Sequence, residues 1–195
     1  MAEVVLFHGG RGLRRGVTLA GDRLRAAGHD VHTPDYYDGE VFDDMAAGQA
    51  KLRALGMDAV IRRGRAAVDE LPDAIVLAGF SLGAMLAELI AATRPGARGA
   101  ILMHGAQRLE ALAVDRWPDG IPAEVHYGEG DELVDADAVM AFGAPVTAAG
   151  ARFDAYAYPC SGHLFADPDL PDYHEESAEL MWQRVEAFLA RVDTA

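Results

Sequence analysis

A glycine-flanked serine between two apolar segments is the feature that most constrains this chain. The pentapeptide Gly79-Phe80-Ser81-Leu82-Gly83 follows a short apolar run, residues 74–78, which is typical of a buried strand. Strong helix formers follow at residues 84–92. Glycine on both sides of the serine permits a tight turn in which strand and helix approach closely. The pattern therefore predicts a sharp strand-to-helix turn that raises the Ser81 hydroxyl above a sheet edge.

Short apolar runs alternate with longer helical patterns along the chain. This alternation predicts a three-layer α/β fold, with a mostly parallel sheet of about six strands and helices on both faces. Because nothing resembles a linker, we expect one domain, residues 1–195. The stretch between His104 and Ala123 is too short for a large lid domain. The expected strands are 3–8, 29–33, 74–79, 99–104, 123–127 and 152–158, and the expected helices are 15–27, 44–55, 58–70, 82–93, 135–149 and 173–192.

Two residues downstream of Ser81 could activate its hydroxyl. A serine nucleophile needs a base, and the base needs a carboxylate that fixes its tautomer. Asp131 follows the strand at 123–127 in a glycine-flanked loop, and His163 follows the strand at 152–158. At strand–turn–helix serine sites the acid and then the histidine follow the serine along the chain. We therefore predict Ser81 as nucleophile, His163 as general base and Asp131 as the residue that orients it.

Other carboxylates and histidines compete for these roles. Glu129 and Glu132 flank Asp131 and are expected to be solvated, whereas Asp135 is placed to cap the next helix. His8 and His104 end strands and could line the site, but they lie at the wrong points in the chain order. The remaining histidines are expected around an early strand (His29 and His32), inside a strand (His126) and on the last helix (His174).

A glycine-rich loop follows the first strand as His8-Gly9-Gly10-Arg11-Gly12. An acyl-transfer site stabilises an oxyanion with backbone amides, and such loops turn their amides inward. We expect the donors to be the amides of Leu82 and Gly10, with Gly9 as the alternative. A dinucleotide-binding loop would need a third glycine at position 15, which is Arg15.

The charge balance and cysteine content exclude several function classes. The formal net charge is −14, so neither nucleic acid nor an anionic membrane surface is an expected partner. A lone cysteine, Cys160, lies off the strand-to-helix turn and favours a reducing, cytoplasmic location. No His, Asp or Glu cluster has metal-ligand spacing, so we expect neither a metal nor a cofactor. Oligomeric state leaves no signal in the sequence.

Together these residues resemble the dienelactone hydrolase family of the α/β-hydrolase superfamily. The resemblance rests on the early strand and glycine loop, Pro34-Asp35-Tyr36-Tyr37, the Ser81 turn, Gly128-x-x-Asp131 and Gly162-His163-x-Phe165. It implies the same assignments: nucleophile, acid and base at Ser81, Asp131 and His163, with oxyanion amides at Leu82 and Gly10.

Three positions depart from the family pattern. The well-known dienelactone hydrolases carry cysteine where this chain has Ser81, and a glutamate where it has Gly9. They also place an arginine shortly after the histidine to bind the substrate carboxylate, which residues 164–167 do not offer. The arginines that could supply positive charge from elsewhere are Arg11, Arg14, Arg15 and Arg53.

We expect a hydrolase that cleaves small-molecule carboxylic esters or lactones through an acyl-enzyme. A thioesterase or acyltransferase would use the same residues. A non-catalytic scaffold that binds a small ligand or partner is the alternative from another class. The site is expected to be open and shaped by the loops at 35–44, 105–122 and 160–173.

Overall fold

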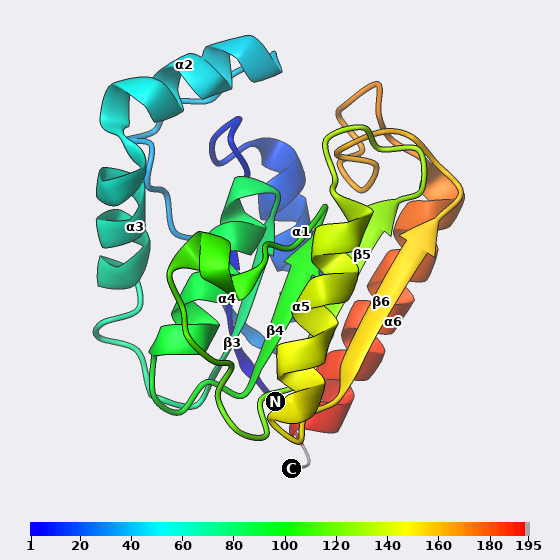
Figure 1. The fold of residues 1–195 in the computed structure, drawn as a ribbon. Helices are drawn as coiled ribbons and strands as arrows, with labels where there is room; N and C mark the ends of the chain where they lie inside the picture. Colours follow the sequence, from blue (N-terminus) through cyan, green and yellow to red (C-terminus); the bar gives the residue numbers. More distant parts are fainter. Residues whose placement is uncertain (194–195) are drawn as a thin grey trace.

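Six parallel strands form one sheet at the centre of the molecule, as the computed structural model in Figure 1 shows. The structure describes residues 1–193, so residues 194 and 195 of the expected domain lie outside it. The strands are ordered β2-β1-β3-β4-β5-β6, and every pairing is parallel. The expected α/β fold is therefore confirmed. The strands are β1 (Glu3–Phe7), β2 (Asp30–His32), β3 (Ile75–Phe80), β4 (Gly99–Met103), β5 (Ala123–Gly128) and β6 (Phe153–Tyr158).

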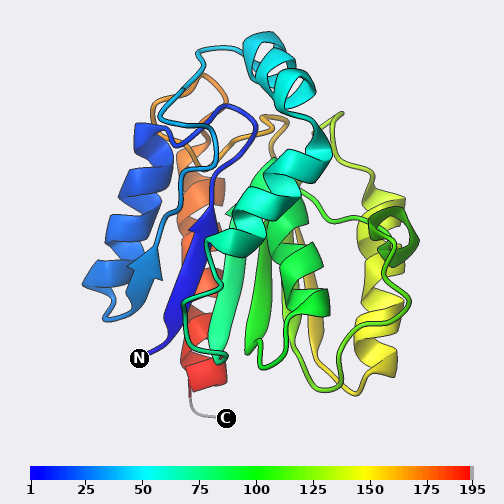
Figure 2. The same cartoon turned by 90° about the vertical axis from the view of Figure 1, so that its left-hand side faces the viewer.

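Helices cover both faces of the sheet (Figures 1 and 2). On one face lie α1 (Arg15–Ala26) and α6 (Glu175–Asp193), and on the other lie α3 (Met57–Ala66), α4 (Leu82–Thr93) and α5 (Ala136–Ala148). The helix α2 (Met45–Leu55) lies beyond the carboxyl ends of the strands, and a short 3₁₀ helix, η1, spans Leu109–Leu112. Within residues 1–193, no helix has the length and apolar character needed to cross a bilayer.

Residues of β1 alternate between two apolar cores. Val4 and Leu6 pack in the core under α1 and α6, whereas Val5 and Phe7 pack in the core under α3, α4 and α5. A sheet buried on both faces produces continuous apolar strands instead of an alternating pattern. This explains why the strands read as short unbroken apolar runs in the sequence.

The helix α3 is shorter than the sequence suggests. It was expected to reach Glu70 but ends at Ala66. The Arg94 guanidinium, at the end of α4, accounts for the difference, because it donates hydrogen bonds to the carbonyl oxygens of Val68 (3.1 Å) and Leu71 (2.8 Å). The Arg94 side chain, which comes later in the sequence, thus provides hydrogen-bond donors for the carbonyl groups that follow the end of α3.

The helices α2, α5 and α6 begin one or two residues later than expected, and side-chain caps explain these differences. Asp44 and Asp135 precede α2 and α5 and accept hydrogen bonds from the amides of Ala47 and Ala138. His174, expected on the last helix, lies immediately before α6, and its Nδ1 accepts a hydrogen bond from the Ser177 amide at 3.3 Å. These polar side chains bind the free amides of the first turn.

Candidate active site

Ser81 occupies the sharp turn between β3 and α4. Its backbone is in a strained conformation for a non-glycine residue, with φ 54° and ψ −111°. A Cβ atom on Gly79 would overlap the carbonyl oxygen of Gly83, and one on Gly83 would overlap the carbonyl oxygens of Phe7 and His8. Both glycines are therefore required by close backbone packing, as the pentapeptide suggests.

The side chains of Ser81, His163 and Asp131 form a continuous hydrogen-bonded chain. His163 Nε2 lies 2.8 Å from Ser81 Oγ, and His163 Nδ1 lies 2.6 Å from Asp131 Oδ2. The Asp131 side chain is buried, while that of His163 remains slightly accessible at 11%. Asp131 Oδ1 accepts a further hydrogen bond from the Leu133 amide at 3.0 Å. This arrangement can pass the Ser81 proton to His163 while Asp131 holds the imidazole in one tautomer.

Backbone hydrogen bonds join the loops that carry the acid and the histidine. The Glu129 amide donates to the Tyr158 carbonyl (2.8 Å), and the Gly130 amide donates to that of Cys160 (3.0 Å). The Ser81 amide in turn donates to the Met103 carbonyl at the end of β4 (2.8 Å). The three side chains are therefore held by the carboxyl ends of β3, β5 and β6, at one edge of the sheet.

The competing acidic residues lie outside this chain. Glu129 and Glu132 are exposed, and Asp135 accepts a hydrogen bond from the Ala138 amide at 3.1 Å as the cap of α5. Cys160 lies in the loop after β6, where burial raises the pKa of its thiol. A raised pKa disfavours the thiolate form that a cysteine nucleophile requires.

Two other histidines are buried near the site. His8 stacks on Tyr36, with ring centroids 3.6 Å apart, and its Nδ1 donates to the Gly9 carbonyl at 2.8 Å, so that it braces the glycine loop. His104 lies between Phe80 and Phe165, with its ring centroid 5.8 Å from that of His163. Burial lowers the pKa of His8 and holds the pKa of His104 well below its usual value. His104 therefore presents an uncharged ring to His163.

The two residues expected to supply oxyanion amides lie on the same wall as Ser81. Leu82 is the first residue of α4, where backbone amides have no partner within the helix. Gly10, Ser81 and Leu82 line one cavity. Gly9 is not among the residues that line this cavity, and a Cβ atom there would be 3.2 Å from the Phe80 carbonyl oxygen. This placement favours Gly10 over Gly9 as the second donor.

A large chamber opens beside Ser81. Its volume is about 740 Å³, and it is lined by residues of α2, α3, α4 and α5, by the segment that contains η1, and by residues 133–135. The lining corrects the expectation that three loops shape the site. Of these loops only 105–122 lines the chamber over several residues, 160–173 contributes His163, and 35–44 does not line it. Met45, Leu52, Met57 and Ile61 line the helical walls, and their apolar spacing predicts helices without indicating that these helices lie beside Ser81.

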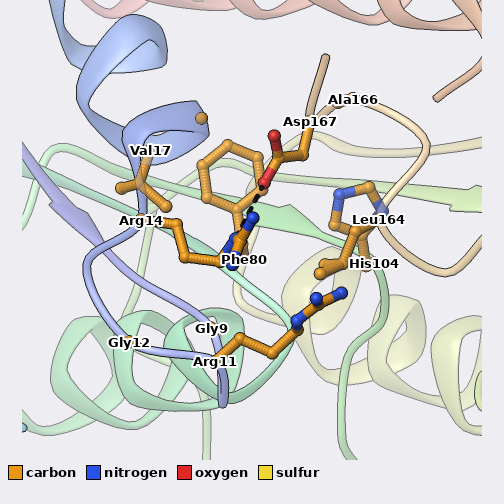
Figure 3. Close-up of a pocket in the computed structure, with 11 residues that line it drawn as sticks. Gly9, Arg11, Gly12, Arg14, Val17, Phe80, His104, Leu164, Ala166 and Asp167 are labelled. Carbon is orange, nitrogen blue, oxygen red and sulfur yellow. Dashed lines mark ion pairs between the residues drawn. The ribbon is translucent and has the colours of Figure 1, made fainter. Parts of the chain in front are cut away.

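A second, smaller cavity lies behind His104 and Phe80 and is drawn in Figure 3. Arg11 and Arg14 line it, and Arg14 Nε lies 3.8 Å from Asp167 Oδ2. Arg11 donates through Nε to the Phe42 carbonyl oxygen (3.2 Å) and through its NH2 group to that of Asp43. Arg15 pairs with Asp169 at 2.6 Å, and Arg53 is exposed on α2. These arginines do not line the chamber beside Ser81.

Folding also gathers three metal-ligating side chain types that are dispersed in the sequence. Glu3, Asp30 and His32 lie on β1 and β2, with ligand atoms within 4.8 Å of one another. His32 Nε2 pairs with Glu3 Oε1 at 3.0 Å. Glu3 and Asp30 begin their strands, so this group lies toward the amino edge of the sheet, whereas Ser81 follows the carboxyl end of β3.

Sequence comparison finds a family pattern and individual relatives that match this chain. The pattern of the dienelactone hydrolase family matches residues 1–193. A Yersinia pestis protein provisionally named a carboxymethylenebutenolidase is 29% identical over 118 residues, which cover 57% of this chain and 44% of that protein. An Escherichia coli K12 protein of the same name is 28% identical over the same shares. These matches span less than half the length of the relatives.

Solved structures share the fold. A Klebsiella pneumoniae protein provisionally named a dienelactone hydrolase is 24% identical, with a TM-score of 0.76 over 97% of this chain and 87% of its own. A promiscuous phosphotriesterase from metagenomic libraries, described as dienelactone hydrolase-like, is 19% identical, with a TM-score of 0.79 over 98% and 87%. A Thermogutta terrifontis esterase is 18% identical, with a TM-score of 0.64 over 98% and 83%.

Proposed function

Because the chain belongs to the dienelactone hydrolase family, we propose that it is a serine hydrolase that cleaves small carboxylic esters or lactones. The hydrogen-bonded chain from Ser81 through His163 to Asp131 carries this proposal. A binding module would not need a nucleophile, a base and a buried acid in one line. The strained backbone at Ser81 adds support, because such strain persists where function requires it.

Acylation begins when Ser81 Oγ attacks the ester carbonyl carbon. His163 Nε2 accepts the serine proton as the new C–O bond forms, and Asp131 stabilises the resulting imidazolium. The carbonyl oxygen gains negative charge, which the amides of Leu82 and Gly10 stabilise. When the tetrahedral intermediate collapses, the bond to the leaving alkoxide breaks and that oxygen takes the proton from His163.

Deacylation repeats these steps with water as the nucleophile. Neutral His163 accepts a proton from water while the water oxygen attacks the acyl carbon. The second intermediate expels Ser81 Oγ, which regains its proton from His163, and the carboxylic acid leaves. For a lactone, alcohol and acid remain on one product molecule. No step requires a metal or an organic cofactor.

Labelling with a fluorophosphonate probe tests the proposal. Wild-type protein should become covalently labelled at Ser81, and Ser81→Ala should lose the label. Ser161→Ala is a matched control, because Ser161 is exposed on the histidine loop and should not affect labelling. Equal weak labelling of wild type and Ser81→Ala would reject the enzyme and leave the non-catalytic scaffold. A panel of esters, lactones and thioesters on the unlabelled wild-type protein, with Ser81→Ala as control, then separates the reaction subclasses.

A further inference from the structure

The chamber beside Ser81 is large and its walls carry little charge. Its volume of about 740 Å³ lies within the range of about 300–1,000 Å³ that is usual for small-molecule sites. Apolar side chains of α2, α3 and α4 dominate the wall, and among the lining residues within 1–193 Asp135 is the only Asp, Glu, Lys or Arg. Its carboxylate already accepts a hydrogen bond as the cap of α5. The chamber therefore suits an uncharged occupant.

Apolar side chains also extend to the rim of the chamber. Met57 and Leu133 line it, yet they are 41% and 62% exposed. When a ligand covers large apolar side chains that were in contact with water, the free energy of the complex is lowered. Met45 and Met85 line the chamber as well, and the flexible methionine side chain adapts to ligands of different shape. These features favour an apolar ligand group.

A carboxylate would be poorly accommodated in the same space. The cationic side chains near the glycine loop, Arg11 and Arg14, line the other cavity and bind backbone carbonyl groups of Phe42 and Asp43. A carboxylate inside the chamber would lose water and find Asp135 instead of a cation. Burial of an unpaired charge is strongly unfavourable.

We propose that this chamber binds an uncharged apolar substituent of the ester, such as an alkyl chain longer than the methyl group of an acetate. We further propose that it selects against substrates with a carboxylate on that substituent. This inference rests on the proposed function at Ser81. It assigns a substrate class that differs from the anionic lactone implied by the family resemblance.

Hydrolysis of p-nitrophenyl esters tests this assignment. From acetate through butyrate to hexanoate, kcat/KM should rise by about fourfold for each methylene group that becomes buried. The p-nitrophenyl monoester of adipic acid matches the hexanoate ester in carbon number but ends in a carboxylate. Its kcat/KM should be at least about a hundredfold lower than that of hexanoate. A parallel series of butyrate esters with longer alcohols shows which side of the scissile bond enters the chamber.

A chamber-filling variant locates the effect. Ala111 lines the chamber from η1 and is exposed, so Ala111→Phe adds bulk there with little effect on the core. This variant should lower the ratio of hexanoate to acetate kcat/KM by about tenfold. Ala54→Phe is the matched control, because Ala54 is exposed on α2 and does not line the chamber. It should retain the wild-type ratio.

A binding measurement keeps the inference testable without turnover. In calorimetry with Ser81→Ala, octyl acetate should bind at least about tenfold more tightly than 8-acetoxyoctanoate, which carries a carboxylate at the end of the same chain, and Ala111→Phe in that background should weaken ester binding. If Ser81 is labelled by the fluorophosphonate but neither ester series rises with chain length, this inference is wrong and the proposed function stands. If Ser81 is not labelled and octyl acetate still binds preferentially, the proposed function fails and the chamber assignment stands as a ligand site.

Discussion

Gly48 of α2 lies so close to Gly10 that a Cβ atom on Gly48 would overlap the Gly10 carbonyl oxygen. The α2 backbone thus presses against the glycine loop that we expect to supply an oxyanion amide. Displacement of that loop would misplace the Gly10 amide relative to the developing negative charge.

Gly48→Ala should therefore lower kcat by about tenfold to a hundredfold, because small displacements of catalytic groups have large effects on rate. Steady-state kinetics with a p-nitrophenyl ester measures this. Gly64→Ala is a suitable control, since a Cβ atom on Gly64 of α3 would meet only side-chain atoms of Leu86, at 3.2 Å. A Gly48→Ala variant with wild-type kcat would show that α2 does not position the loop.

Asp131→Asn should lower kcat by roughly 10³-fold or more while the fold persists. The amide can no longer stabilise the imidazolium, and it favours the wrong tautomer of His163. Glu129→Gln and Glu132→Gln alter exposed neighbours and should stay within about twofold of wild type. If either control loses as much activity as Asp131→Asn, the assignment of the acid is wrong.

Glu88→Gln should remove a pH dependence of stability. Burial raises the pKa of Glu88 on α4 to about 8, above the value near 4.5 expected in the unfolded chain. Between about pH 5 and 8 the unfolded state loses this proton and the folded state retains it, so stability falls as pH rises. The loss over that interval is up to about 4 kcal/mol.

Thermal unfolding of wild type and Glu88→Gln across this range measures the difference. The Tm of Glu88→Gln should decline less toward pH 8, and Glu110→Gln, at an exposed site, should follow wild type. Parallel profiles for Glu88→Gln and wild type would show that Glu88 ionises normally.

His104 should make the folded state less stable as the pH falls, which is the opposite of the pH dependence expected for Glu88. Burial holds its folded-state pKa well below 6.5, so below about pH 6.5 the unfolded state binds a proton that the folded state does not. Stability is therefore lost as pH falls from that value. His104→Asn should weaken this acid destabilisation, and asparagine tolerates the φ of 68° at this position.

The difference in Tm between about pH 5 and pH 7 measures this pH dependence. A loss of packing that lowers Tm equally at both pH values does not change the difference. His32→Asn serves as control, because the His32 ring is partly exposed on β2. The His104 prediction fails if both variants show the wild-type difference between the two pH values.

Local signals explain which parts of the site were predictable. Gly79 and Gly83 flank Ser81 in a recognisable pentapeptide, although a Cβ atom on Gly83 would meet the distant carbonyl oxygens of Phe7 and His8. Asp131 and His163 each follow a strand, in a fixed chain order after the serine. Such features can be read from a single sequence. The same holds for the six strands, whose apolar runs reflect burial on both faces.

The remaining features depend on contacts between distant segments. The end of α3 depends on Arg94, and the close packing of Gly48 on Gly10 depends on where α2 lies. Neither relationship leaves a local pattern, so helix length and chamber shape could not be derived. Met45 and Met57 read as ordinary helix residues until α2 and α3 are placed beside Ser81.

The position of α2 beyond the sheet has a consequence for how this protein can diversify. The proposed reacting groups follow β3, β5 and β6, whereas α2 lies beyond these strands (Figure 2). The helix α2 buries only Gly48 completely and contributes Met45 and Leu52 to the chamber. Substitutions on its inner face can therefore change which molecules are accepted while the reaction machinery is inherited intact. Gly48 is the residue of α2 that packs against the Gly10 loop, so it should tolerate less variation than the rest of the helix.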